Sequence, residues 1–416
     1  MNMTLCRRRS GCRLCGSEAV SLAFSLTPTP PANSFVTVTQ KGSKQAIFPL
    51  DIFFCENCHH VQLLDVVDPA HLFENYVYVS GTSPVFVNHF ENYARHVTKT
   101  YLAETSRNLV VDIGSNDGTL LAQFKSAGLR VLGIDPAKNI AKTANAKGIE
   151  TIPKFFSAKL AREIRHSYGA AHAICANNVF AHADDLADIS NGIRLLLAPD
   201  GVFVFEVSYL VDVFEKTLFD TIYHEHLAYH SVSPLRRFFT SIGMELISAT
   251  RIKAHGGSLR GVAQLEGGPH HPDGSVETRI KQEVSVGLDK VKTLRGFGDK
   301  VDRIKIELNR LLEDLKSAGN SIAGFGAPAK ATTLLYHFGI GPEIIDFIVD
   351  DSPLKQGLFS PGMHIPVLPP DAIYDRKPDA LVILAWNFAN SIMAKHSSYA
   401  EQGGRFIVPL PEVVIH

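Results

Sequence analysis

After residue 100, short apolar runs alternate with longer stretches in which apolar residues recur every three or four positions. A short apolar run bounded by glycine or proline is typical of a buried strand, and a period of about 3.6 residues is typical of an amphipathic helix. The alternation therefore predicts an α/β fold with largely parallel sheets. The strands predicted in the first such stretch are 108–114, 129–136, 172–178 and 201–207.

A second Rossmann-like α/β unit is predicted after a long amphipathic helix at 299–317. A strand that begins near residue 320 leads into the turn Gly324-Phe325-Gly326-Ala327, and the next helix carries Lys330 in its first turn. The N–H groups at such a helix start, helped by a lysine, suit a phosphate. A tight turn that binds nothing is equally compatible with these residues. Further strands are predicted within 344–349, 380–387 and 405–411.

The N-terminal region contains two CxxC pairs, Cys12 with Cys15 and Cys55 with Cys58, separated by 39 residues. Two such pairs can present four thiolates to one tetrahedral zinc ion, provided that the segment between them folds back. A redox CxxC would need a thioredoxin-like setting, which the sequence does not show, and unrelated thiols are the remaining alternative. We predict a structural zinc site with no open position for chemistry.

Composition narrows the class of protein. The 416 residues carry 41 basic and 42 acidic side chains, and only the run CRRR at 6–9 concentrates one sign. This balance argues against nucleic-acid and membrane-surface binding. The start MNMTLCRRRSGC lacks the apolar core of a secretory signal, and the longest apolar runs, such as 380–386, are too short to span a bilayer. Six cysteines form no disulfide scaffold in a chain of this length, so we expect a cytoplasmic enzyme.

A glycine turn, DIGSNDG at 112–118, follows the first predicted strand. Its spacing is G-x-N-x-G, which differs from the G-x-G-x-x-G of dinucleotide-binding folds and resembles motif I of class I S-adenosylmethionine (SAM) methyltransferases. Asp135 ends the next strand, 23 residues after Asp112, in the position of an acid that binds ribose hydroxyls. It could instead cap the following helix. The predicted SAM-binding residues are Asp112, Gly114, Asn116, Gly118, Asp135 and Asn178.

The segment TIYHEHLAYHS at 221–231 gathers two tyrosines, three histidines and a glutamate. A metal site is disfavoured, because the second histidine of an HExxH motif would stand at Ala228. A buried structural histidine would explain one of these residues better than it explains the run YHEH at 223–226. A histidine with a glutamate and a phenol nearby can remove a C–H proton and stabilise the resulting oxyanion. A strand would separate His226 from Glu225, so we expect an irregular loop or a helix start.

Taken in order, these elements resemble the three-domain, SAM-dependent C-methyltransferases that act on nucleotide-linked 4-keto-deoxysugars in bacteria. The resemblance covers nearly the whole chain, and its YxEH and HGGS-R elements are the most specific. We expect a zinc-binding module at 1–72, a methyltransferase domain at 73–250 and a C-terminal α/β domain at 251–416. The matching segments are the CxxC pairs, YVYVSGTS (76–83), VDIGSNDG (111–118), NNVFAH (177–182), YHEH (223–226), HGGSLR (255–260), GFGAPAK (324–330) and DDSPLKQG (350–357).

The resemblance implies roles for individual residues. His226 is the implied general base, although His224 and Tyr223 remain alternatives for taking the proton. Three of these segments also have purely structural alternatives. Tyr76 could be a packing residue, His182 could cap a helix, and HGGSLR could be a plain hairpin turn. The residues implied at the reacting sugar are Tyr76, His182, Tyr223, Glu225 and His226. The residues implied in holding the sugar nucleotide are His255, Ser258, Arg260, Gly326 and Lys330.

The implied reaction begins with removal of the proton next to the ketone, and the enolate carbon then takes the methyl group of SAM. Histidine suits the first step because its ordinary pKa is about 6.5. The same fold could instead methylate oxygen or nitrogen, or epimerise a sugar with SAM as a scaffold. A zinc-dependent binding module with a degenerate SAM fold, and an NAD-dependent enzyme that uses GFGAPAK, are further alternatives.

Overall fold

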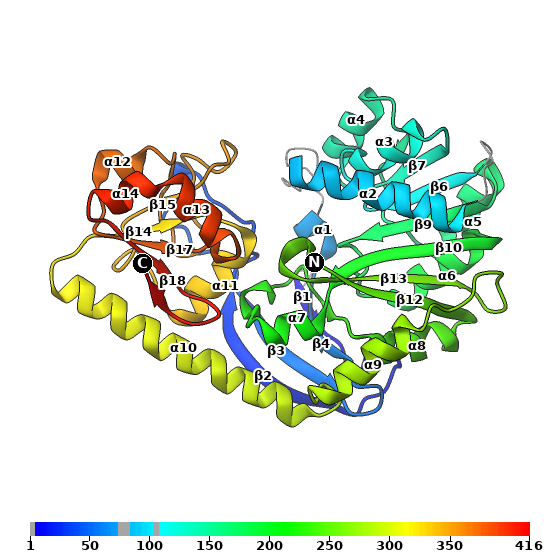
Figure 1. Ribbon diagram of the computed structural model, residues 1–416, viewed down its shortest axis with the longest axis horizontal. Helices are drawn as coiled ribbons and strands as arrows, with labels where there is room; N and C mark the ends of the chain where they lie inside the picture. The colour runs from blue at the N-terminus through cyan, green and yellow to red at the C-terminus, as the bar shows by residue number, and fades with distance from the viewer. Residues whose placement is uncertain (1–4, 74–83, 103–107) are drawn as a thin grey trace. The chain divides into compact units, whose positions relative to one another are not determined.

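The computed structural model describes residues 5–73, 84–102 and 108–416 (Figure 1). Contacts divide the chain into two interleaved units. The first unit comprises Met1–Ser21, Phe54–Val211 and Leu227–Lys290, and the second comprises Leu22–Phe53, Asp212–His226 and Val291–His416. The division into domains at 1–72, 73–250 and 251–416 stays a prediction. In the described residues, no helix has both the length and the hydropathy that crossing a bilayer requires.

The first unit is built on a seven-stranded sheet. Its strands are β6 (Leu109–Ile113), β7 (Arg130–Ile134), β8 (Thr151–Ile152), β9 (Ala171–Asn177), β10 (Leu197–Ser208), β12 (Met244–Ile252) and β13 (Ser258–Leu265). Their order is β12-β13-β10-β9-β6-β7-β8, with an antiparallel edge formed by β12 and β13 on an otherwise parallel sheet. The four strands predicted in 108–207 are confirmed as β6, β7, β9 and β10.

The strand order reverses between β6 and β9. The chain runs from β6 outward through β7 to β8, and then returns to the other side of β6 with β9 and β10. In doubly wound sheets the loops at such a point diverge and leave a crevice for a ligand beyond the carboxyl ends of the strands. The predicted SAM-binding turn and the loop after β9 both stand at this point.

Helices of the first unit pack their apolar faces against this sheet (Figure 1). Tyr93 of α2 and Phe124 of α3 are fully buried with Val110 of β6 and Val204 of β10. The phenol of Tyr93 donates to the carbonyl of Val204, which satisfies its only polar group inside the core. These helices are α2 (Pro84–Tyr101), α3 (Thr119–Ser126), α4 (Lys138–Ala146), α5 (Ala158–Tyr168), α6 (Leu186–Leu196), α8 (Val232–Ser241) and α9 (Ser275–Ser285).

The N-terminal part of the first unit consists of short elements. β1 (Cys6–Arg8) pairs with β5 (Asp65–Val67), and β4 (Val61–Leu63) pairs with β11 (Ala228–Tyr229), both antiparallel. α1 (Pro69–Phe73) follows β5. Strands of two or three residues bury little apolar surface, so this part depends on cross-links such as a metal site for its stability.

The second unit contains a six-stranded sheet with the order β16-β15-β14-β17-β18-β19. It is parallel except for β19, and its strand order reverses between β14 and β17. The second predicted Rossmann-like unit is thus confirmed. The strands are β14 (Ile322–Phe325), β15 (Ile348–Val349), β16 (Val367–Leu368), β17 (Ala380–Ile383), β18 (Arg405–Val408) and β19 (Val414–Ile415).

Figure 1 shows three short C-terminal helices along one side of this sheet and α11 (Ala329–Phe338) on the other. The long helix α10 (Val291–Ser317) begins earlier than the predicted residue 299. The sequence pattern missed the first turns of this helix because they contain Gly296 and Gly298, which are poor helix formers. At Gly298 a Cβ would lie 2.7 Å from Cβ of Phe24, so glycine permits close packing there. The short helices are α12 (Ala372–Arg376), α13 (Ala389–Lys395) and α14 (Ser397–Glu401).

Two further segments belong to the second unit. The first is residues 22–53 of the N-terminal region, which include most of β2 (Val20–Thr29) and of β3 (Phe48–Cys55). These two strands are neighbours in a sheet. α7 (Leu210–Glu215) and the 3-10 turn η3 (Phe219–Thr221) lead to the YHEH residues. The N-terminal region therefore contributes to both units.

Candidate functional site

The four predicted zinc ligands meet in one cluster. The sulfur atoms of Cys12, Cys15, Cys55 and Cys58 all lie within 4.8 Å of one another. Cys12 and Cys58 are separated by 3.6 Å between sulfur atoms, and Cys15 and Cys55 by 3.5 Å. A tetrahedral zinc ion with Zn–S bonds of about 2.3 Å places its sulfur ligands about 3.8 Å apart. The cluster therefore fits zinc, with all four positions taken by protein.

The arginines of the CRRR run next to this cluster divide between two acids: Arg8 pairs with Asp65, and its two neighbours pair with Asp184. Arg9 forms an ion pair with Asp184 at 2.9 Å, and the fully buried Arg13 forms a second one with the same carboxylate at 3.5 Å. Arg7 also pairs with Asp184. Asp184 lies two residues after His182, whose ring stacks on Phe73 at 5.8 Å. The zinc-binding part thus holds the loop that carries His182.

The predicted SAM turn has the backbone of a ligand cradle. Gly114, Asn116 and Gly118 have φ angles of 69°, 50° and 79°, in the left-handed region that glycine and asparagine tolerate best. A Cβ at Gly114 would lie 2.3 Å from a methyl carbon of Val179, on the loop after β9. Glycine is therefore required here both for conformation and for the close approach of the two loops.

Asp135 closes this turn from the end of β7. Its two carboxylate oxygens accept from the N–H groups of Asn116 and Ala137, both at 2.9 Å. The N-cap of α4 is Ala137, so Asp135 is not the helix cap that the sequence left open. Each carboxylate oxygen has a second lone pair for a ribose hydroxyl, and the cradle therefore fits SAM.

Burial shapes the acidity of this site. It raises the pKa of Asp135 above its ordinary value, although the N–H groups of Ala137 and Asn116 act in the opposite direction. Asp112, at the end of β6, has a pKa well above the ordinary range because it is buried and close to the charge of Asp135. Hydroxyl donors of a bound ligand would offset this desolvation.

The loop after β9 stands beside a buried charge cluster, of which the sequence reasoning named only Arg260. Asn178, with φ of 55°, donates its N–H to the carbonyl of Glu206 at 2.8 Å. The Glu206 carboxylate, only 2% exposed, lies 2.8 Å from Nε2 of His89 and 2.7 Å from Nε of Arg260. The sequence signal for this cluster was the glutamate inside the apolar strand GVFVFEV, because a buried carboxylate needs charged or hydrogen-bonding partners.

The YHEH residues form an irregular turn, as expected, and belong to the second unit. The N–H of His226 donates to the carbonyl of Tyr223 at 2.8 Å, and the two rings lie 4.1 Å apart between centroids. Nδ1 of His226 lies 2.7 Å from the carbonyl oxygen of Thr221. A carbonyl only accepts, so Nδ1 carries the proton and the lone pair of the neutral ring is on Nε2.

The two residues between Tyr223 and His226 point elsewhere in the second unit. Glu225 is buried and accepts from the amide of Asn33 at 2.8 Å. His224 is 1% exposed, and its Nε2 donates to the carbonyl of Phe48 at 3.2 Å. Each histidine thus has one ring nitrogen on a carbonyl, and His226 is the better placed to receive a proton because it is only partly buried.

The residues predicted to hold the sugar nucleotide are divided between the two units, with Ser258 and Arg260 in the first and Gly326 and Lys330 in the second. Ser258 is buried and donates to the carbonyl of Ala254 in the β12–β13 hairpin, where Gly256 and Gly257 have φ of 88° and 144°. The hairpin alternative for HGGSLR thus accounts for its glycines. The side chains of Tyr76 and His255 lie outside the described residues.

Lys330, at the start of α11, lies 3.3 Å from a carboxylate oxygen of Asp220 and 4.1 Å from the ring centroid of Trp386. Gly326 precedes it, with φ of 87°, and a Cβ there would lie 2.5 Å from Cβ of Ala385. The turn is therefore tightly packed against the loop after β17.

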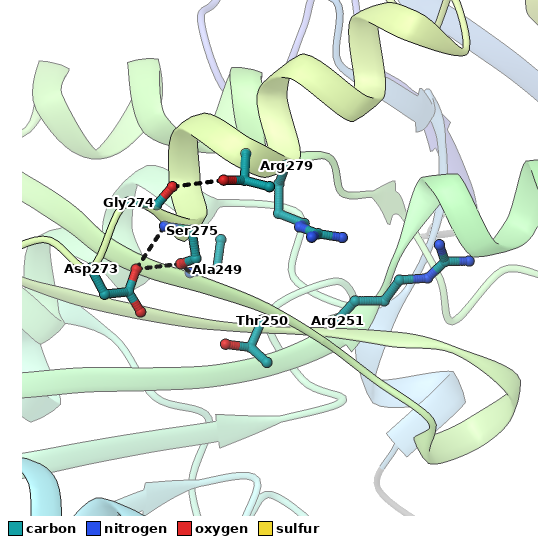
Figure 2. A pocket seen from close by; sticks show the side chains of 8 residues that line it. Ala249, Thr250, Arg251, Asp273, Gly274, Ser275 and Arg279 are labelled. Carbon is teal, nitrogen blue, oxygen red and sulfur yellow. Dashed lines mark hydrogen bonds between the residues drawn. The ribbon is translucent and has the colours of Figure 1, made fainter.

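A surface hollow of about 600 Å³ lies elsewhere in the first unit, between the end of β12 and the start of α9 (Figure 2). Arg251 and Arg279 extend along it, and Asp273 accepts from both the N–H and the hydroxyl of Ser275. None of the residues predicted from the sequence lines it.

Solved structures that resemble this chain do so only weakly, as two examples show. The magnesium protoporphyrin IX methyltransferase of Synechocystis PCC 6803 is 14% identical, with coverage of 44% of this chain and 82% of that chain and a TM-score of 0.33. The PH0226 protein of Pyrococcus horikoshii OT3 is 13% identical, with coverage of 45% and 95% and a TM-score of 0.36. At these TM-scores neither likeness bears on function.

Sequence similarity identifies the family. Residues 12–73 match a zinc-binding domain, residues 87–249 a methyltransferase domain and residues 253–411 a C-methyltransferase C-terminal domain. The chain is 36% identical over 401 residues to the C-methyltransferase NovU of Streptomyces niveus. The aligned residues cover 96% of this chain and 95% of NovU. The chain therefore belongs to the C-methyltransferase family that joins these three domains, and is a methyltransferase with SAM and structural zinc as its cofactors.

Proposed function

We propose that this C-methyltransferase acts on a nucleotide-linked 4-keto-deoxysugar, with His226 as the base that removes the proton next to the ketone. The observation that carries this proposal is the hydrogen bond from Nδ1 of His226 to the Thr221 carbonyl. It leaves the lone pair on Nε2, as a general base requires.

The ketone makes the chemistry possible. Nε2 of His226 takes the proton, and the electrons of the C–H bond pass into an enolate whose charge rests on the ketone oxygen. SAM supplies an electrophilic methyl group, so that a C–C bond forms as the S–CH₃ bond breaks. The phenol of Tyr223, in ring contact with His226, is suited to stabilising the enolate oxygen.

The sugar-nucleotide class rests on the family resemblance, and transfer of the methyl group to carbon is supported by the NovU relative, which is named a C-methyltransferase. Within this proposal, His182 contacts the sugar from the loop after β9, and Tyr76 is a second contact to the sugar. Glu225, whose carboxylate accepts from Asn33, supports the turn beside His226. His255, Ser258, Arg260 and Gly326 are proposed on the nucleotide side. The donor residues are proposed as Asp112, Gly114, Asn116, Gly118, Asp135 and Asn178.

The experiment is incubation of the protein with SAM and a panel of nucleotide 4-ketosugars, in H₂O and in D₂O, followed by mass spectrometry and NMR. We expect a product heavier by CH₂, with its new methyl group on carbon. The His226→Gln variant should lose both methylation and deuterium exchange. His224→Gln is the matched control, because His224 lies in the same turn but is almost completely buried.

A methyl group on oxygen or nitrogen would support the different-acceptor alternative. Deuterium uptake without methylation would favour an epimerase. Undiminished turnover in His226→Gln would reject this residue as the base.

A further inference from the structure

Two residues from separate parts of the second unit, Trp386 and Lys330, meet around one buried carboxylate, that of Asp220. The indole N–H of Trp386 donates to its Oδ2 at 2.6 Å, and Nζ of Lys330 lies 3.3 Å from the same atom. Lys330 also lies over the ring of Trp386, at 4.1 Å from the centroid. Asp220 is fully buried, and the side chain of Lys330 is only 13% exposed. This is an internal ion pair stacked on an aromatic ring.

The cluster occupies the point where the strand order of the second sheet reverses. Lys330 follows the turn after β14, and Trp386 follows Ala385 in the loop after β17. Doubly wound sheets commonly receive a ligand here. In this protein the lysine side chain is engaged by Asp220, and the N–H of Ala327 in the same turn donates to the carboxylate of Asp350 at 2.6 Å. Two carboxylates of the chain thus take groups that would otherwise suit a phosphate.

The same cluster borders the residue that orients His226. Asp220 and Thr221 both belong to η3, and the Thr221 carbonyl accepts from Nδ1 of His226. On the other side of Thr221, the carbonyl of Ile222 accepts from the hydroxyl of Thr333 at 2.8 Å. Helix α11 therefore holds the chain on both sides of Thr221.

The spacing on α11 explains how one helix makes these contacts. Lys330 and Thr333 lie three residues apart on α11, and Phe338, the last residue of the helix, separately stacks on Phe219 at 5.1 Å. Residues separated by three positions on a helix share a face. The contacts of α11 thus cover 219, 220 and 222 in turn, and they leave the Thr221 carbonyl to His226.

We infer that Lys330 and Trp386 are positioning residues, which together with Asp220 fix the 219–222 segment so that Thr221 holds the proton on Nδ1 of His226. The inference rests on the proposed function in that His226 is the base. It gives Lys330 a role different from contact with the sugar nucleotide. It also makes the C-terminal domain a support for the catalytic turn.

Burial makes the pair sensitive to the loss of either partner. It lowers the pKa of Lys330 and raises that of Asp220, and the attraction between the two opposes both shifts. Removal of the lysine leaves a buried carboxylate without its cation, whereas removal of both charges leaves a neutral cluster. A double variant should therefore be less impaired than the Lys330 variant alone.

The test compares Lys330→Met, Asp220→Asn, the double variant and Thr333→Val in the full chain, with thermal melts to show that each is folded. We expect Lys330→Met to lower kcat by about 100-fold with KM for the sugar nucleotide changed less than threefold, because a misplaced base slows chemistry. The double variant should recover at least tenfold. Thr333→Val, which removes one hydroxyl, should lower kcat in the same direction by a smaller factor.

A second readout does not depend on turnover. In protein with ¹⁵N-labelled histidine, the ring signals absent from His226→Gln belong to His226. We expect the Nδ1–H tautomer in the unsubstituted protein and a mixture of tautomers in Lys330→Met. UDP and dTDP serve as probes of phosphate binding, and their affinity should be equal in the two proteins.

A tenfold loss of UDP or dTDP affinity in Lys330→Met, with kcat and the tautomer unchanged, would overturn the inference in favour of a phosphate contact. A double variant as impaired as Lys330→Met would also reject it. If His226→Gln stays active while the tautomer still responds to Lys330→Met, the base assignment fails and the positioning role survives.

Discussion

Nε2 of His89 lies 2.8 Å from Oε2 of Glu206, and the other oxygen of this carboxylate accepts from Nε of Arg260. Burial alone would raise the pKa of Glu206, but the hydrogen bond from His89 and the charge of Arg260 lower it below its ordinary value. A carboxylate with a lowered folded-state pKa stabilises the fold above its unfolded-state pKa, and loses this contribution as the pH falls through the folded-state value.

Glu206→Gln should therefore destabilise the protein most at neutral pH. We expect a loss of about 3 kcal/mol at pH 7, because a buried charge cluster loses its central partner. The difference from the unsubstituted protein should shrink as the pH falls below 4.5, the ordinary pKa of a glutamate, and on through the lower pKa of folded Glu206. Urea unfolding at several pH values measures this, and a difference independent of pH would contradict it.

Zinc removal should loosen the loop that carries His182 as well as the N-terminal part. The reason is that Arg9 and Arg13, which flank Cys12, hold Asp184 on that loop. Cys58→Ser should lose zinc in elemental analysis and become susceptible to proteolysis near residue 184, with a loss of about 4 kcal/mol in the free energy of unfolding. Cys6→Ser is the control, because Cys6 is outside the cluster. Full zinc content in Cys58→Ser would contradict the site.

Gly114→Ala should abolish SAM binding for two separable reasons. The residue has φ of 69°, and its new Cβ would lie 2.3 Å from a methyl carbon of Val179. Gly128→Ala is the matched control, since Gly128 has φ of 85° but nothing within 4 Å of its Cβ. We expect about 1–2 kcal/mol of strain in the control and intact SAM affinity. Partial recovery of binding in Gly114→Ala with Val179→Ala would identify the clash, and normal binding in Gly114→Ala alone would argue against this cradle.

Asp135→Asn should weaken SAM binding by at least tenfold in calorimetry. The amide places an NH₂ group where a carboxylate oxygen now accepts from the N–H of Asn116 or Ala137, and the charged acceptor for the ribose is lost. The exposed Asp200→Asn controls for the change in net charge. An unchanged dissociation constant in Asp135→Asn would remove this residue from the donor site.

Sequence patterns predicted the features that depend on local spacing. The four cysteines, the glycine turn and the strand-end Asp135 all follow from residue types at short separations, and the structure brings them together as expected. The irregular turn at YHEH could also be anticipated, because a strand would have separated His226 from Glu225.

Relationships between distant segments could not be predicted in this way. His89 and Glu206 are 117 residues apart, and Lys330 and Asp220 are 110 apart, so no local period connects them. In each pair one charged residue lies in an apolar stretch of sequence. Such a position indicates that the charge has a partner in the fold but does not identify that partner. The start of α10 was missed for a different reason, since Gly296 and Gly298 are poor helix formers in the sequence pattern, although Gly298 permits close packing on Phe24.

The interleaving of the two units has a consequence for synthesis of the chain. The polypeptide passes from one unit to the other after Ser21, Phe53, Val211, His226 and Lys290. Domains made of continuous sequence can fold in order as they leave the ribosome. Here the first unit lacks part of its chain until residue 290 has been made, and the turn that carries His226 waits for α11 and Trp386 before its anchors exist. The turn that carries the proposed base therefore acquires these anchors late, when nearly the whole polypeptide has been translated.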